Sequence, residues 1–279
     1  MVNIRSLDPS ASPLDYYGWE LRRLREEAGL NQQQLGDIVF CSASLIGQVE
    51  TAKKVPTRKF SEQLDAALMT GGLFARLVGV VLKSQLPKWF QPYAEMEAKA
   101  TYISTYQAQL VYGLLQTEDY ARAVLSVDHR EKLDEMVAAR MERQRILDRE
   151  HPPVVCVVLD EAALRLEIGG REVMRAQLQH LLDCMRRPWI QIQVLPFSAG
   201  GHAGMMGSFN LLRFEDDPDI CYMAGYGAGQ MTTNPQVIRE RSVAYARLQA
   251  SALSHEDSAA LITRVMEERY GHQPGPTVA

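Results

Sequence analysis

The sequence predicts a multidomain fold: an all-α head of five helices that contains a helix-turn-helix, followed by an α+β domain with a small mixed sheet. The length of 279 residues is too great for one small helical domain and sufficient for two. Apolar residues at helical spacing dominate the head, whereas strand-like runs begin only near residue 100. These observations place the helix-turn-helix domain at 1–71, a linker helix at 72–95, the α+β domain at 96–270 and a disordered tail at 271–279.

A first helix is predicted over about 14–28, with an apolar stripe on one side and Gly29 as a stop signal. The stripe consists of Tyr17, Leu21, Leu24 and Ala28. After it, residues 31–50 have the spacing of two short helices joined by a tight turn. Asn31 and Gln34 match a capping box at the start of the first of these two helices.

The first helix of the predicted motif turns Leu35 and Ile38 toward one face, with Gly36 between them. Gly inside a helix is less favourable than Ala by about 1 kcal/mol, so Gly36 indicates that the next helix approaches closely. Ser42 is suited to cap that next helix.

The second helix of the motif has an outer face made of small and amide side chains. Ile46 and Val49 face inward and leave outside Ala43, Ser44, Gly47 and Gln48. Such a face can enter a major groove of DNA, where Gln bonds the edge of adenine through two hydrogen bonds. DNA binding is therefore the leading hypothesis for the head, with Ala43, Ser44 and Gln48 as the residues that read bases.

Two further helices complete the predicted head. The fourth begins at Thr57 or Ser61 and directs three apolar residues to the core: Phe60, Leu64 and Leu68. The fifth, over 72–86, is too apolar to face solvent on all sides. It is expected to pack between the domains or against a second subunit.

The charge of the head is balanced overall but locally basic. Residues 1–70 contain eight Lys and Arg against nine Asp and Glu, within a chain of net charge −4. Directly after the second motif helix, however, come four basic residues: Lys53, Lys54, Arg58 and Lys59. Phosphate contacts need only such a local cluster. A nearly neutral head predicts modest affinity for each subunit, and therefore a homodimer.

The second domain is predicted to combine parallel and antiparallel strands. Strand-like runs lie at 102–107, 154–159, 190–195, 208–214 and 220–224. A helix over about 171–186 separates the second run from the third, which predicts a parallel β-α-β unit. Short turns between the later runs favour antiparallel neighbours. Further helices are expected at about 118–125, 131–149, 235–250 and 256–269.

Other candidate sites have simpler readings. The loop 200–204 is interpreted as a flexible hairpin rather than a lid over a ligand, and the segment 225–229 is interpreted in the same way. His202 is the residue of the first loop that could contact a ligand or partner. Asp160 and Glu161 end a strand, where helix caps are favoured over an acid/base pair. The helix 131–149 carries Arg140 and Arg143 among acids, which favours a solvated, ion-paired face over a docking patch for an acidic partner.

The composition predicts a cytoplasmic protein that is not an enzyme. No run of 18 apolar residues indicates a membrane span, and the polar N-terminus argues against a signal peptide. The four Cys are scattered without a CxxC pair and are read as reduced core thiols. The six His show no spacing typical of zinc, and no GxSxG elbow occurs. We therefore expect no metal, no cofactor and no catalytic residue.

From about Tyr17 to Leu68 the chain resembles the helix-turn-helix of the xenobiotic-response-element (XRE) regulators. The residues that carry the resemblance are Gln32, Leu35-Gly36, Ile46, Val49-Glu50, Lys53-Lys54 and Pro56. It implies that Gln32, Lys53 and Lys54 contact phosphates, to which Arg58 is added here, and that Ala43, Ser44 and Gln48 face bases. The chain departs from the pattern where a turn Gly is usual and Phe40 stands, and where Thr51-Ala52 replace the Gly after the Glu. A left-handed conformation at Phe40 would be unfavourable by roughly 1 kcal/mol.

From about Trp89 to Met266 the chain resembles a domain of unknown function that follows such heads in actinobacterial regulators, sometimes called antitoxin-like. The residues that carry the resemblance are Gly113–Thr117, Asp119–Arg122, Arg140, Arg143-Gln144, Leu159–Glu161, Ala163–Arg165, Gln177-Leu178, Ile192–Pro196 and Gly207–Phe209. The departures are Tyr112 and Met223-Ala224. The resemblance implies a cytoplasmic, nucleoid-associated transcription regulator that is often encoded beside a small partner protein.

The sequence thus favours a homodimeric regulator that binds double-stranded DNA at half-sites about 34 Å apart. Its second domain would receive a signal from a small, acidic protein partner or a small-molecule effector. One alternative is an interaction module whose helix-turn-helix no longer reads sequence. A further alternative is a ligand-processing enzyme in the second domain, which would need convergent polar groups in a pocket.

Overall fold

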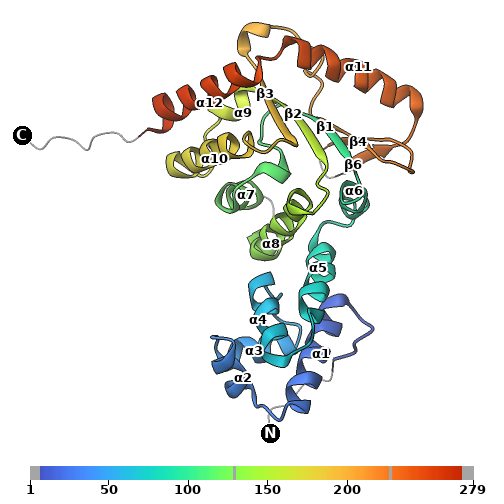
Figure 1. Ribbon diagram of the computed structural model, residues 1–279, viewed down its shortest axis with the longest axis vertical. Helices are drawn as coiled ribbons and strands as arrows, with labels where there is room; N and C mark the ends of the chain where they lie inside the picture. Colours follow the sequence, from blue (N-terminus) through green and yellow to red (C-terminus); the bar gives the residue numbers. More distant parts are fainter. Residues whose placement is uncertain (1–6, 128–129, 226–227, 272–279) are drawn as a thin grey trace, which may run out of the picture. The chain divides into compact units, whose positions relative to one another are not determined.

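The computed structural model describes residues 7–127, 130–225 and 228–271. The chain divides into two compact units, Met1–Lys88 and Trp89–Ala279, which appear in Figure 1 as a helical unit and a unit built around a sheet. The predicted fold class, a helical head followed by an α/β unit with a mixed sheet, is confirmed. No helix in the described ranges combines the length and the apolar character needed to span a membrane.

The head consists of five helices whose ends follow from local capping. They are α1 (Pro13–Glu27), α2 (Gln32–Ile38), α3 (Ala43–Glu50), α4 (Arg58–Leu68) and α5 (Leu73–Gln85). The predicted capping box is present, because the Asn31 side chain accepts from the Gln34 amide while the Gln34 side chain accepts from the Asn31 amide. Ser42 caps α3 as expected, and Thr57 rather than Ser61 caps α4.

Two residues of the predicted apolar stripes face solvent. Ile38, expected to face inward, is 48% exposed, and Val39 is buried in its place. Ile38 is the last residue of α2, and the chain leaves the helix through Phe40 at φ 55°. Ala28 is likewise exposed, whereas Arg25 occupies a buried position on α1.

The helix α5 buries its apolar side within the head. Phe74, Val78, Val81 and Leu82 are buried, and α5 packs against α1 and α4. The rings of Phe74 and Tyr17 lie 5.1 Å apart. Val80 of the same helix remains 55% exposed, and the expected packing of the helix between domains or against a second subunit stays a prediction. The segment 72–95, expected as a linker helix, contains α5, the end of the first unit and part of α6 (Gln91–Glu97).

The second unit is built on a six-stranded sheet in the order β3-β2-β1-β4-β5-β6. Its strands are β1 (Tyr102–Gln107), β2 (Val154–Asp160), β3 (Ile190–Leu195), β4 (Phe209–Arg213), β5 (Ile220–Ala224) and β6 (Gly229–Thr232). β1, β2 and β3 are parallel, and β4, β5 and β6 add antiparallel neighbours. The predicted parallel β-α-β unit is thus β2-α10-β3, in which α10 spans Arg171–Cys184. The short strand β6 was not predicted.

The sheet has a helical layer on each face. The helices of this unit are α6 (Gln91–Glu97), α7 (Glu118–Leu125), α8 (Leu133–Gln144), α9 (Glu161–Arg165), α10 (Arg171–Cys184), α11 (Pro235–Ser251) and α12 (His255–Tyr270). Short 3-10 turns lie at Gly113–Leu115, Arg130–Lys132, Arg145–Asp148 and Phe197–Ala199. Residues of α6, α7, α10 and α12 pack on one face of the sheet, and α11 covers the other (Figure 1).

The predicted hairpin over 200–204 is wrong. This loop joins β3 to β4, and these two strands are separated in the sheet by β2 and β1. The loop therefore crosses the end of the sheet instead of turning between neighbours. The segment 225–229 does join the neighbouring strands β5 and β6, although residues 226–227 lie outside the described part.

Candidate nucleic-acid interface

The outer face of α3 presents a pair of polar side chains. Ser44 and Gln48 are exposed, and Gln48 Nε2 donates a hydrogen bond to Ser44 Oγ at 3.2 Å. Ala43, the third predicted base-reading residue, is half-buried at the start of the helix. The inward side carries Ile46, Val49 and Glu50. The only acidic residue of α3 therefore points into the protein, and the exposed face offers uncharged hydrogen-bonding groups.

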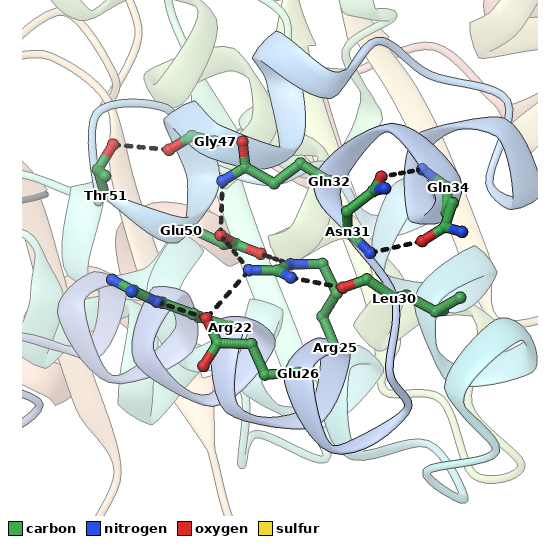
Figure 2. A network of polar contacts seen from close by, with 10 residues as sticks. All are labelled: Arg22, Arg25, Glu26, Leu30, Asn31, Gln32, Gln34, Gly47, Glu50 and Thr51. Atoms are coloured by element: carbon green, nitrogen blue, oxygen red, sulfur yellow. Dashed lines mark hydrogen bonds and ion pairs between the residues drawn. The ribbon is translucent and has the colours of Figure 1, made fainter. Parts of the chain in front are cut away.

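One buried carboxylate connects three helices behind this face (Figure 2). Glu50 of α3 accepts from Arg25 of α1, through Nε to Oε1 and through Nη2 to Oε2 at 3.2 Å. Gln32 of α2 donates to the same Oε2 at 2.8 Å. Arg25 also donates through Nη1 to the carbonyl oxygen of Leu30, in the turn between α1 and α2. We name this set, Arg25, Gln32 and Glu50, the head frame.

The head frame fixes α3 because its charges are compensated inside the protein. Hydrogen bonding to Glu50 raises the pKa of Arg25, although burial opposes the shift. Both side chains are largely removed from water. A buried ion pair with additional hydrogen bonds is costly to break from one side, so loss of either partner would destabilise this arrangement of the helices.

Close backbone approach at two glycines adds to this constraint. A Cβ atom at Gly36 of α2 would lie 2.6 Å from the carbonyl oxygen of Cys41, in the turn before α3. A Cβ atom at Gly18 of α1 would lie 2.6 Å from the carbonyl oxygen of Val49. The expectation that Gly36 permits close approach of the next helix is confirmed.

The residues predicted to contact phosphates lie before and after α3 in the chain. Gln32 is half-buried and bonds Glu50, but an amide nitrogen carries two hydrogens, so it can donate to a phosphate at the same time. Lys53 is exposed and Lys54 half-buried in the turn after α3, and half-buried Arg58 opens α4. Whether these groups contact DNA stays a prediction, whereas their placement around α3 is observed.

Phe40 and Ala52 occupy the two positions where the chain departs from the XRE pattern. Both have positive φ, 55° and 54°, so the turns keep the left-handed conformation without glycine. Phe40 is 89% exposed, so its side chain makes little packing contact that could offset the unfavourable left-handed backbone conformation. The helix-turn-helix geometry is retained at both sites.

Arg143, predicted as a solvated residue or a partner contact, lies instead inside the second unit. Its side chain is 8% exposed and donates through Nε to Glu97 Oε2 at 2.8 Å. Glu97 of α6 is buried and also accepts from the hydroxyls of Tyr93 and Tyr112. Burial lowers the pKa of Arg143, but the charge and hydrogen bonds of Glu97 outweigh this effect and raise it. Arg143 is therefore unavailable to a partner at the surface.

His202, the other ligand candidate, fastens the loop between β3 and β4 to the end of β2. Its Nδ1 accepts from the Gly204 amide at 3.2 Å, and its Nε2 lies 3.6 Å from Asp160 Oδ2. The Tyr106 hydroxyl donates to the same oxygen at 3.1 Å. Asp160 also caps α9 through the amide of Ala162, as predicted. These contacts connect His202 to residues of its own unit.

Glu161 has a different role from the predicted cap. It accepts from the Phe197 amide at 2.8 Å and pairs with Arg165. Among the residues that the structure describes, no group of three His, Cys, Asp or Glu side chains has a geometry suited to a metal ion. All four Cys are free, and three of them are buried.

Sequence reasoning missed the head frame. The signal was nevertheless present, because Arg25 and Glu50 lie at positions where the apolar stripes of α1 and α3 place core residues. A charged residue at a core position requires a partner of opposite charge. Two such residues on adjacent helices therefore indicate a buried ion pair.

Comparison with known families agrees with the division of the chain. A model of a helix-turn-helix domain matches residues 17–77, which identifies a helix-turn-helix protein, the class to which many DNA-binding regulators belong. A model of a domain of unknown function (DUF5753) matches residues 90–264, more than half of the chain. The chain belongs to this DUF5753 family. No curated protein and no solved structure matches it.

Proposed function

We propose that this protein is a homodimeric, sequence-specific transcription regulator of the XRE type that reads DNA through α3. The observation that carries the proposal is the exposed Ser44–Gln48 pair on a helix that the head frame holds in place. Internal pairing of Glu50 leaves the exposed face of α3 without an acid to repel phosphates. The basic residues Lys53, Lys54 and Arg58 follow directly along the chain.

The need for two subunits follows from the charge of the head. Because acids and bases balance in residues 1–70, the non-specific attraction of one head to DNA is weak. Two heads on half-sites one helical turn apart, about 34 Å, would add their contacts. We further propose that the second unit, antitoxin-like in character, receives a signal from a small protein or a metabolite in the cytoplasm. No catalytic role is proposed for it.

Selection of binding sites from random duplex DNA by the full chain tests the proposal. We expect enrichment of a palindromic sequence. Gln48→Ala should lower affinity for that site by about 1–3 kcal/mol and relax the preference at one base pair in each half-site. If no sequence is enriched, and the affinity for DNA depends on salt concentration but not on base sequence, the result would instead support a head that no longer reads sequence.

Gln33→Ala provides a matched control. Gln33 is also exposed and also donates to a side chain one helical turn away, Asp37, at 2.8 Å. It lies on α2, outside the proposed reading face. This variant should keep the base preference of the wild type. If Gln48→Ala and Gln33→Ala behave alike at every base pair, α3 does not read the sequence.

A further inference from the structure

Arg140 of α8 carries a positive charge that makes no ion pair with any residue that the structure describes. Among the residues that the structure describes, its guanidinium has one hydrogen-bond partner, the Oε1 atom of Gln116 at 2.7 Å. This partner is an uncharged amide. The side chain is half-buried, and the guanidinium nitrogens that make no hydrogen bond are not fully buried, so part of the guanidinium remains open to solvent.

Glu97, the acid whose charge acts on Arg140, is already paired with other groups. Its Oε1 accepts from the hydroxyls of Tyr93 and Tyr112, at 2.9 and 2.8 Å, and from Arg143 Nη2 at 3.1 Å. Its Oε2 accepts from Arg143 Nε at 2.8 Å. Arg143 and Glu97 therefore neutralise each other, and Arg140 leaves the cluster with one positive charge in excess.

Gln116 holds Arg140 in a fixed orientation. The buried Gln116 amide donates through Nε2 to the Val111 carbonyl at 2.7 Å, which directs its Oε1 toward Arg140. Gln144 Nε2 donates to the carbonyl oxygens of Gly113 and Gln116, and Gln177 bonds the turn from its other side. The acceptor that positions Arg140 thus belongs to a turn held by several side-chain hydrogen bonds. A group bound by Arg140 would meet a preorganised donor.

The electrostatics favour an anion at this place. Burial, and next the charge of Arg143, lower the pKa of Arg140 to about 10. The guanidinium is still charged at neutral pH, but its charged form is disfavoured by its surroundings. An anion in contact with the open side of the guanidinium would reverse this penalty.

We propose that Arg140 is the centre of a binding site for a carboxylate. A guanidinium presents parallel N–H groups that match the two oxygens of a carboxylate, and one carboxylate supplies the single negative charge that the cluster lacks. Binding by Arg140 does not depend on any DNA-binding activity. Its use as the place where the second unit receives a signal rests on the proposed function.

Calorimetric titration of the full chain with succinate, at constant ionic strength set by sodium chloride, tests the site. We expect saturable binding to the wild type. Arg140→Gln should bind at least about tenfold more weakly, since a charge-assisted pair is lost. Arg140→Lys should give an intermediate affinity, because it retains the charge without the planar fork. Thermal unfolding of each variant confirms that it is folded.

Arg145→Gln is the matched control, since Arg145 lies on the next helical turn and its side chain is mostly exposed. It should bind succinate as the wild type does. The proposal is overturned if succinate does not bind, if Arg140→Gln binds it unchanged, or if Arg145→Gln loses it equally. Equal binding of inorganic phosphate would overturn the assignment to carboxylates. Because no DNA is present, none of these results bears on DNA binding by the head.

Discussion

Replacement of Glu50 by Gln should loosen the head while leaving the second unit unchanged. Glu50 is the shared acceptor of the head frame, and its side chain is 2% exposed. Gln has the same shape but no charge, and its NH2 group would face donors of Arg25 or Gln32. Arg25 would then keep the Leu30 carbonyl and a contact of 3.3 Å with the exposed Glu26. A buried guanidinium would be left without adequate compensation.

The expected loss of stability is about 3 kcal/mol. Removing one member of a buried ion pair is generally destabilising by 3–5 kcal/mol, because the remaining charge stays in a poorly solvated place. The lower end applies here, since the remaining Gln oxygen can still accept one hydrogen bond. A loss of about 3 kcal/mol corresponds to roughly a 150-fold increase in the population of opened head.

Hydrogen exchange of the full chain, followed on separate peptides, measures this effect. Amides of α1 and α3 should exchange roughly 150-fold faster in Glu50→Gln, by the conversion above. Amides of β2, in the other unit, should exchange at the wild-type rate and serve as the internal control. The double variant Arg25→Met/Glu50→Leu should recover much of the protection, since both charges are gone. An increase of less than fivefold in Glu50→Gln would refute the role assigned to the head frame.

Two other changes test the packing and the charge state of the chain. Gly36→Ala should destabilise the head by about 1–2 kcal/mol in the same exchange assay, because contact with the Cys41 carbonyl outweighs the better helix propensity of Ala; unchanged protection would contradict the close approach. Burial, and next the charge of Arg187, lower the pKa of His180 in the folded chain. As the pH falls below about 6.5, the unfolded chain therefore binds a proton at His180 before the folded chain does, and the second unit loses stability. In His180→Gln, protection of β3 should depend less steeply on pH between about 5 and 7, and an unchanged slope would exclude this cause.

The helices of the motif could be predicted because their ends are encoded locally. The capping box of Asn31 and Gln34 and the cap at Ser42 need only residues within one turn. The failure at Ile38 has a local cause as well, since α2 ends there and the inward position passes to Val39. Apolar spacing identifies the buried side of a helix and is ambiguous at its last residue.

Contacts between distant segments could not be predicted in the same way. Arg143 lies among acids on its own segment, which favours ion pairs along the surface of that segment. Its actual partner, Glu97, comes from α6, 46 positions earlier in the chain. Similarly, the strand-like runs around 190–195 and 208–214 look like neighbours in sequence, yet β1 and β2 lie between β3 and β4. Sequence spacing does not record which strand is central.

The two buried Arg–Glu pairs differ in the charges that surround them. In the head, Arg25 and Glu50 neutralise each other and bond an amide, so the frame is closed and the exposed face of α3 is left to make contacts. In the second unit, Arg143 and Glu97 pair in the same way, but Arg140 adds a charge whose one hydrogen-bond partner among the described residues is the uncharged Gln116. The charges of the head frame need no outside group, whereas the second unit would gain electrostatic free energy if an anion bound at the site proposed around Arg140. Such a gain would alter DNA binding only if the anion favoured one arrangement of the two heads over another.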